Sequence, residues 1–190
     1  DKGMTEGEID YYTVSFSNKE VRESFNEMLL GSYLDSTPSE SGISVYEIRA
    51  AFLENDLEKV KQIIETMFHS LPVELFEKKD KNGKIKPVGE NFYHAIIYLI
   101  FNLLGVKMKA EVMVQNGRID AIVETTGHIY LFEFKKDRSP DAAIQQIQNN
   151  EYFKPYLLSN KVIHLIGVRF SLENRGIDAE KDWKELILNG

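Results

Sequence analysis

The sequence has no cysteine among its 190 residues and only four histidines. The first absence excludes a disulfide framework, a thiolate zinc site and a cysteine nucleophile, and the second argues against a histidine-rich metal site. Any metal is therefore expected on oxygen ligands. No uncharged apolar run reaches the roughly 18 residues of a membrane span, and no secretory signal pattern opens the chain. These absences favour a cytoplasmic protein, and a first residue Asp1 rather than Met indicates a fragment of a longer one.

Hydrophobic residues make up 43% of the chain and charged residues 28%, which is enough to build a sizeable core, and the length predicts one domain with at most a small appendage. The net charge of −7 argues against tight, non-specific binding to nucleic acid. This charge is uneven: residues 1–77 carry 16 acidic and 6 basic residues, a net of −10, whereas residues 78–190 carry 14 and 17, a net of +3. We therefore expect an acidic helical segment or linker over 1–77 and a folded core over 78–190.

Residues 1–77 repeat apolar side chains at helical spacing and show no constellation suited to chemistry. One helix is predicted that is capped by Ser17 or Asn18 and stops at Gly31, and two more are predicted between residues 45 and 71, separated at Asn55–Asp56. The next run, 78–86, holds five lysines around an Asn-Gly turn signal. It is interpreted as a solvated loop at the domain boundary, with a phosphate-contacting patch as the alternative.

From residue 90 onward the predicted elements alternate. Gly89–Glu90–Asn91 opens an apolar helix over 92–104, and Ser139–Pro140–Asp141 opens another through Gln148, with continuation to Leu157 left open. Strands are predicted at Ala110–Gln115, Arg118–Glu124, Ile129–Lys135 and Val162–Phe170, and a short amphipathic helix around Trp183. The order α-β-β-β-α-β predicts an α/β (α+β) fold with a mixed central sheet flanked by helices, because consecutive strands favour hairpins and a strand after a helix can enter in parallel.

The hairpin between residues 117 and 137 carries the charged residues best suited to chemistry. If Thr126–Gly127 is a two-residue loop, Asp120 lies directly opposite Glu133. Two carboxylates in that position repel each other unless a cation, most naturally a divalent ion, lies between them. Because side chains alternate along a strand, Lys135 shares the face of Glu133. The alternative is an exposed, ion-paired sheet face that also includes Arg118, Glu124 and His128, and the geometry alone favours neither interpretation.

Two further acids could complete such a site. Glu90 and His94 are four residues apart on the predicted helix and share one face, so Glu90 could reach the same ion; His94 by itself is more typical of a hydrogen-bonded helix residue. If Asn116–Gly117 is a two-residue loop, Met113 pairs with Asp120, and Glu111 lies on the same face two positions away. Which of Glu90 and Glu111 is the third acid stays open.

These residues carry a resemblance to a known family. They are Gly117–Asp120, Tyr130–Lys135, Glu90 with Tyr93 and His94, the helix Ala143–Ile147 with Tyr152, and Ile166–Val168 with Phe170. Their order resembles the PD-(D/E)XK nuclease superfamily, and in particular the nuclease-like C-terminal domain that follows an AAA-ATPase-like domain in many bacterial proteins. Residues 18–22 resemble the junction after that ATPase part. The resemblance implies a restriction-endonuclease-like core and covers nearly the whole chain.

The resemblance also implies roles for individual residues. In the superfamily the Asp and Glu bind Mg²⁺ and the Lys orients or activates the attacking water, which carries over to Asp120, Glu133 and Lys135. Glu90 matches the acid of the first core helix, and Gln146 matches the glutamine of the helix after the third strand. Ile stands before Asp120 in place of Pro, and Asn150 stands where a lysine is expected, so a phosphate contact from this helix is in doubt unless Lys154 supplies it.

The expected function is therefore a Mg²⁺-dependent nuclease, with Mn²⁺ as an alternative metal, that hydrolyses phosphodiester bonds, with DNA as the expected substrate. A basic rim is expected from Lys135, Lys136, Arg138, Lys154 and Lys161. The alternative is a catalytically silent nuclease-fold module that mediates protein or nucleic-acid interactions for an attached ATPase domain. A third, weaker hypothesis is a metal-dependent hydrolase of another phosphate ester.

Overall fold

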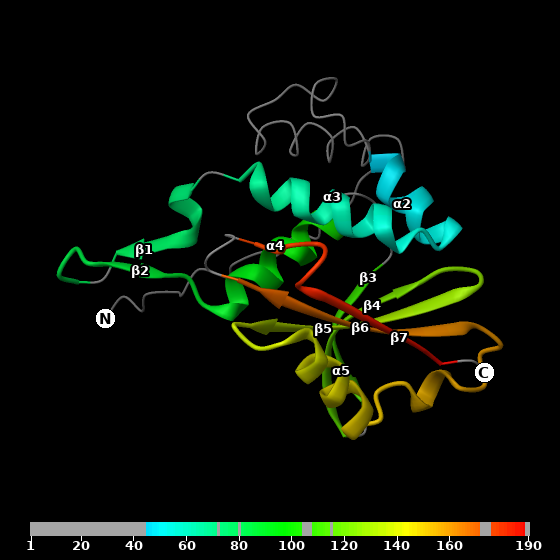
Figure 1. Cartoon of the computed structure of the whole chain (residues 1–190). Helices are drawn as coiled ribbons and strands as arrows, with labels where there is room; N and C mark the ends of the chain where they lie inside the picture. Colours follow the sequence, from blue (N-terminus) through cyan, green and yellow to red (C-terminus); the bar gives the residue numbers. More distant parts are fainter. Residues whose placement is uncertain are drawn as a thin grey trace, which may run out of the picture.

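A five-stranded mixed sheet forms the centre of the computed structural model shown in Figure 1. The structure describes residues 45–71, 73–79, 81–103, 108–114, 116–171 and 176–188. The strands lie in the order β3 (Met108–Val114), β4 (Gly117–Glu124), β5 (His128–Lys136), β6 (Val162–Phe170) and β7 (Trp183–Leu188). The β5–β6 pair is parallel and the other neighbouring pairs are antiparallel. The prediction of a mixed sheet is thus confirmed, and the helix expected over 18–31 lies outside the described residues.

Helices cover both faces of this sheet. In Figure 1, α2 (Val45–Glu54), α3 (Leu57–His69) and α4 (Glu90–Leu103) lie on one side and α5 (Pro140–Asn149) on the other. There are also two short 3₁₀ helices. The first, η1 (Val73–Phe76), follows α3, and the second, η2 (Lys154–Tyr156), follows α5. The order α4-β3-β4-β5-α5-β6 is the predicted α-β-β-β-α-β order. None of the helices in the described part of the chain is long and apolar enough to span a membrane.

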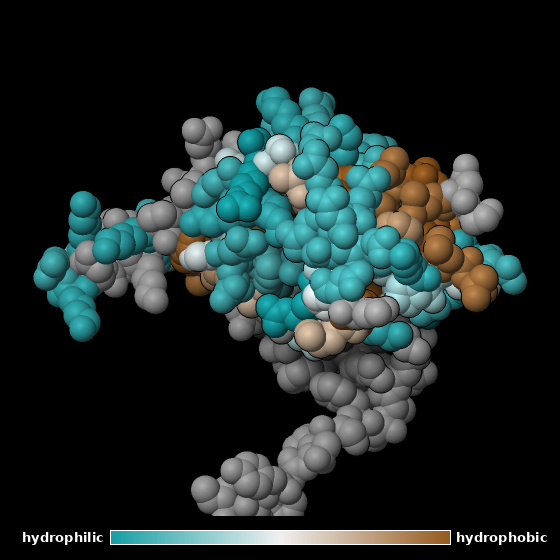
Figure 2. All heavy atoms as spheres, turned by 90° about the horizontal axis from the view of Figure 1, so that it is seen from below, coloured by the Kyte–Doolittle hydropathy of each residue, from teal (hydrophilic) through white to brown (hydrophobic). Residues whose placement is uncertain are grey.

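Strand alternation divides the buried apolar residues into two clusters. Tyr130, Phe132 and Phe134 of β5 join the larger cluster, together with α2, α3 and α4. Ile129 and Leu131 point the other way and join the smaller cluster under α5. Figure 2 shows the molecule from the α5 side, where hydrophilic residues cover most of the surface and hydrophobic residues gather on one side of the view.

The predicted break between α2 and α3 is confirmed. Asn55 adopts a left-handed φ of 57°, and the Asp56 carboxylate caps α3 by accepting the Lys59 N–H at 3.0 Å. The Tyr130 hydroxyl, on β5, donates to Phe52 O and lies within hydrogen-bond distance of Asn55 Oδ1. This contact fixes the turn between the two helices to the sheet.

The N-terminus of α5 lies very close to β6. Ser139 caps the helix by accepting the Ala142 N–H, as predicted. A Cβ added to Gly167 would lie 2.2 Å from Pro140 O, so no other residue fits there without a shift of the helix. Because Gly167 pairs with Glu133, this close approach brings the start of α5 beside the charged part of β5.

One helix prediction is wrong, and the structure defines the end of a second helix that the sequence left open. The segment around Trp183 is not a helix but strand β7, which pairs with the free edge of β6. Its apolar residues fit either period in so short a segment, and the partner strand decides between them. Helix α5 does not continue to Leu157: it ends at Asn149, and Glu151 adopts a left-handed φ of 54° that a helix cannot contain.

The lysine-rich run also differs from the prediction of a loop. It forms a small hairpin in which β1 (Glu77–Lys79) pairs antiparallel with β2 (Ile85–Pro87). Gly83 has a φ of 75°, which agrees with the turn signal read from the sequence.

The register predicted for the β3–β4 hairpin is wrong by two residues. Val114 pairs with Gly117 and Met113 with Arg118, so Met113 does not pair with Asp120. Gly117 is the first residue of β4 rather than part of the turn. It has a φ of 142°, and a Cβ there would lie 2.8 Å from the Tyr152 hydroxyl, so packing explains this glycine.

Candidate active site

Glu133 and Lys135 lie near the carboxyl end of β5, on the face that carries α5. Glu133 is only 1% exposed, and its Oε1 accepts a hydrogen bond from Lys135 Nζ at 2.7 Å. Phe132 and Phe134 point to the opposite face, as strand alternation predicts. A buried Glu133 rules out the alternative of an exposed, ion-paired sheet face at this position.

Strand β4 leaves β5 at Asp120. The pairs from Ala121↔Phe132 to Glu124↔Ile129 have the register predicted for this hairpin. Beyond them the Asp120 carboxylate, rather than a backbone carbonyl, accepts the Phe134 N–H at 2.8 Å. Ala121 belongs to the larger cluster and Ile119 to the smaller one, although residues two apart normally share a face. A sharp twist of β4 at Asp120 therefore opens the sheet beside Glu133.

The environment of Glu133 is unfavourable to its negative charge. Burial, and after it the charges of Asp120 and Glu90, raise the pKa of Glu133 to about 7, although the neighbouring Lys135 opposes the shift. Oε1 has its hydrogen bond to Lys135, but Oε2 is buried without a hydrogen-bond partner in the described structure. A buried carboxylate oxygen that has no hydrogen-bond donor can instead bind a cation.

Helix α4 brings Glu90 and His94 to the same place. His94 Nε2 lies 3.7 Å from Glu90 Oε1 and 3.9 Å from Asp120 Oδ2, too far for a hydrogen bond in either case. Within the described residues this buried nitrogen has no hydrogen-bond partner. Glu90 and His94 thus share one face of α4, as their spacing of four residues predicts, and His94 lies near both Glu90 and Asp120.

The other two candidates are less closely connected to this group. Position 111 falls between the pairs Ala110↔Ala121 and Val112↔Ile119, across from Asp120, but the side chain of Glu111 lies outside the described part of the structure. Gln146, on α5, is half-buried. Among the described residues, no hydrogen bond joins its side chain to Asp120, Glu133 or Lys135.

The expected basic rim is not continuous. Lys161 precedes Val162, which pairs with His128 at the amino end of β5, whereas Lys135 is near the carboxyl end of that strand. Lys161 also donates to Glu124 Oε1 at 2.7 Å. Lys154 is paired with Glu151 at 2.6 Å. The prediction that Lys161 belongs to a basic rim around the site is therefore wrong. Lys161 and Lys135 lie at opposite ends of the parallel β5–β6 pair.

The donor set fits a hard divalent cation bound by few protein ligands. In the part of the chain that the structure describes, no three histidine, aspartate or glutamate side chains are arranged to hold a metal ion. Mg²⁺, however, needs only one or two carboxylates, with waters and substrate oxygens completing its shell. The unpartnered Oε2 of Glu133, the adjacent carboxylate of Asp120 and the raised pKa of Glu133 agree with that requirement.

Sequence reasoning missed one charged pair next to this site. Arg169 of β6 lies beside Lys135, and its guanidinium binds Asp182, which is fully buried. The only signal in the sequence was a basic residue between the apolar Val168 and Phe170 of a buried strand.

Comparison with known proteins agrees with this geometry. Residues 88–180 match the model of a family described as the PD-(D/E)XK nuclease superfamily. The mixed five-stranded sheet with its flanking helices is consistent with the restriction-endonuclease-like fold.

One curated relative extends the similarity over most of the chain. It is named "Uncharacterized protein in vnfD 5'region", comes from Azotobacter chroococcum mcd 1, and is 32% identical over 168 residues. The alignment covers 87% of this chain but only 31% of that protein, so the chain spans less than a third of the relative's length. No solved structure matches the chain.

Proposed function

We propose that the segment matching the family model is a Mg²⁺-dependent nuclease domain that hydrolyses phosphodiester bonds in DNA, with Mn²⁺ as an alternative metal. The observation that carries this proposal is the buried Glu133: Lys135 binds one of its oxygens, and the other is unpartnered beside Asp120. A buried, incompletely neutralised carboxylate that has a second carboxylate and a lysine beside it is costly to keep for structure alone.

Asp120 and Glu133 would hold the metal ion in this domain. Glu90 is proposed as the third acid because its charge acts on Glu133 from the start of α4. A bound divalent cation polarises the scissile phosphate and lowers the pKa of a coordinated water.

Lys135 has a separate role in the proposed reaction. Its ammonium group is mostly buried and held by Glu133, so it places a positive charge where the phosphate gains negative charge during attack. It can also donate a hydrogen bond to the attacking water. For Gln146 we propose a positioning role on the same face of the sheet, supported by the family resemblance and by its place on α5.

A silent module is the second candidate. It is favoured by the net charge of −7 and by Lys135 being already paired with Glu133. In this case the nuclease-like segment would serve an attached ATPase-like domain by binding protein or nucleic acid. That neighbouring domain is itself a proposal, supported by the resemblance of residues 18–22 and by the greater length of the relative.

The test combines metal binding with cleavage. Isothermal titration of Mg²⁺ and Mn²⁺ into the wild type and Asp120→Ala is followed by cleavage assays of single- and double-stranded DNA on the same samples. The nuclease proposal expects metal binding that Asp120→Ala loses, together with metal-dependent cleavage. Metal binding by both proteins, or no cleavage of either DNA by the wild type, would favour the silent module.

A further inference from the structure

The α5 face of the sheet changes from apolar to charged along the strands. Side chains of paired residues in adjacent strands point to the same face, so the pairs form rows across β5, β6 and β7. Near the amino ends of β5 and β6 a row consists of Leu131, Leu165 and Leu186. Near their carboxyl ends the rows consist of Glu133, Gly167 and Lys184, and then of Lys135, Arg169 and Asp182.

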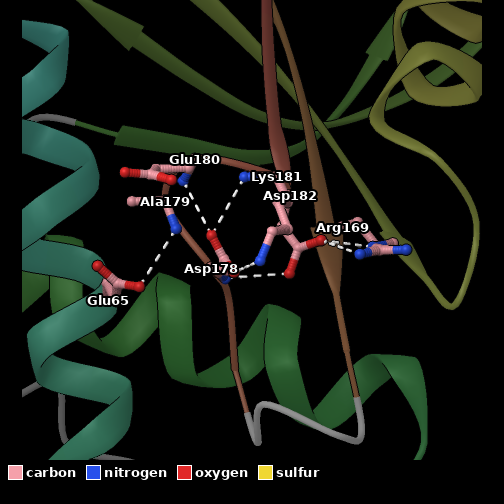
Figure 3. Close-up of polar contacts among 7 residues, drawn as sticks. All are labelled: Glu65, Arg169, Asp178, Ala179, Glu180, Lys181 and Asp182. Atoms are coloured by element: carbon pink, nitrogen blue, oxygen red, sulfur yellow. Dashed lines mark hydrogen bonds and ion pairs between the residues drawn. The ribbon is translucent and has the colours of Figure 1, made fainter.

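Asp182 holds the Arg169 guanidinium in place. This carboxylate is fully buried; its Oδ1 accepts from Nε and Nη2 of Arg169, and its Oδ2 accepts the Asp178 N–H at 3.0 Å. Asp178 in turn accepts the N–H groups of Glu180 and Lys181, so the turn before β7 is itself well fixed. Figure 3 shows the guanidinium pointing away from this turn and from α3.

The guanidinium keeps donors available for another group. Arginine has five N–H donors, and Asp182 uses those on one edge. The Arg169 side chain is 36% exposed, so the remaining donors can reach a molecule in solvent. An arginine that is anchored on one edge and open on the other loses little conformational entropy when it binds an anion.

Lys135 and Arg169 are side by side on one face, which is unfavourable for two like charges unless anions lie nearby. Each cation has one acid partner, Glu133 and Asp182 respectively. If Glu133 engages a metal ion, its hold on Lys135 weakens, and the two cations then face the same incoming group. A nucleic-acid backbone, with a phosphate at each nucleotide, supplies the matching negative charge.

We propose that Arg169 is a second phosphate-binding cation of this site, which positions the nucleic-acid strand through a phosphate oxygen, and that Asp182 is a positioning residue for Arg169. This inference rests on the proposed nuclease function. It names the sugar-phosphate backbone, and not the bases, as what this side of the site recognises.

The experiment uses a double variant that keeps the shape of the pair. Arg169→Gln with Asp182→Asn replaces the ion pair by neutral amides and leaves no unpaired buried charge. Binding of a fluorescently labelled DNA duplex is measured by anisotropy in Ca²⁺ over a range of KCl concentrations. We expect binding about tenfold weaker than wild type and a log–log salt slope smaller by about one, as for the loss of one phosphate contact.

A matched control removes an ion pair from the other side of the sheet. Lys59 of α3 pairs with Glu47 at 3.5 Å, and the variant Lys59→Gln with Glu47→Gln should keep the wild-type affinity and slope. Cleavage in Mg²⁺ should show an increased KM in the Arg169 variant with a smaller change in kcat.

The outcomes separate this inference from the proposed function. If the wild type binds and cleaves DNA but the folded Arg169 variant has unchanged affinity and slope, the Arg169 inference is wrong. If the double variant does not fold, Arg169→Met with Asp182→Leu replaces it, because apolar residues of similar size also remove the charge without leaving an unpaired one, and wild-type affinity and slope in it would equally overturn the inference. A wild type that neither binds nor cleaves DNA would overturn the proposed function itself.

Discussion

The two ends of the β5–β6 pair both bury polar side chains, but only one end satisfies them. At the amino end His164 is fully buried, and both of its ring nitrogens have partners: His128 Nδ1 at 2.9 Å and Glu185 Oε1 at 2.5 Å. At the carboxyl end Glu133 is equally buried, yet its Oε2 has no partner in the described structure. The first group is complete as it stands, whereas the second is completed only by something that binds.

The difference distinguishes a fully hydrogen-bonded buried group from one that keeps an open acceptor. A buried network with every hydrogen bond made stabilises one arrangement of the chain. A buried carboxylate with a raised pKa and an open oxygen costs stability, which is typical of sites that bind or react. The comparison therefore predicts opposite consequences for substitutions at the two ends.

The largest effect is expected from Lys135→Ala, which should lower the rate of cleavage by about 10³-fold because it removes the charge beside the reacting phosphate. Metal affinity should change little, whereas the melting temperature of the metal-free variant should fall because the buried Glu133 loses its partner. Lys161→Ala is the matched control, since Lys161 is also 2.7 Å from a glutamate oxygen but at the amino end. Single-turnover assays measure both; cleavage that survives in Lys135→Ala would remove its catalytic role.

His164→Ala should instead lower the free energy of unfolding by about 3 kcal/mol, because it leaves a cavity and removes a partner from Glu185 and His128. Urea unfolding measures this loss. Metal affinity of the folded variant should match wild type, since the site is at the other end of the strands. If the variant lost metal binding but kept its stability, His164 would belong to the binding site, and the contrast drawn between the two ends of the strands would be wrong.

Glu133→Gln should stabilise the metal-free protein at high pH. The raised pKa means that the folded state binds the Glu133 proton more tightly than the unfolded chain, so this residue's contribution to stability falls as pH rises from about 4.5 to about 7. Relative to wild type, the variant should gain about 3 kcal/mol at pH 8 and little at pH 4.5. Urea unfolding in EDTA at several pH values tests this, and a pH-independent difference would contradict it.

The smallest effect is expected from Asp120→Asn in EDTA, a gain of less than about 1 kcal/mol. The amide oxygen can still accept the Phe134 N–H, and the variant relieves repulsion with Glu133. Thermal unfolding measures the change, and calorimetry should show a loss of metal affinity. A strong destabilisation would instead identify Asp120 as the partner of a structural ion pair with His94.

Local signals were sufficient for most of the elements. The break at Asn55–Asp56, the cap at Ser139 and the strand Val162–Phe170 follow from periodicity and turn chemistry within a few residues. The β4–β5 register was also predictable, because a two-residue loop and strand alternation determine it. These features placed Glu133 and Lys135 on one face before any tertiary contact was known.

Features that depend on distant partners could not be predicted in the same way. Strand β7 exists because β6 offers it an edge, and the β3–β4 register depends on the packing of Gly117 against Tyr152. The pairing of Arg169 with Asp182 requires both strands to be placed first. The burial of Glu133, which excludes a solvated sheet face at this position, likewise depends on the whole fold.

The hydrogen bond from Tyr130 to the α2–α3 turn has a practical consequence for making shorter expression fragments. A fragment cut to the family match alone would lose α2, α3 and β7, and would leave aromatic rings such as Phe132 and Phe170 open to water. Such a fragment is expected to aggregate, and its inactivity would be uninformative about the site. The shortest useful fragment begins ahead of Val45 and continues through Leu188.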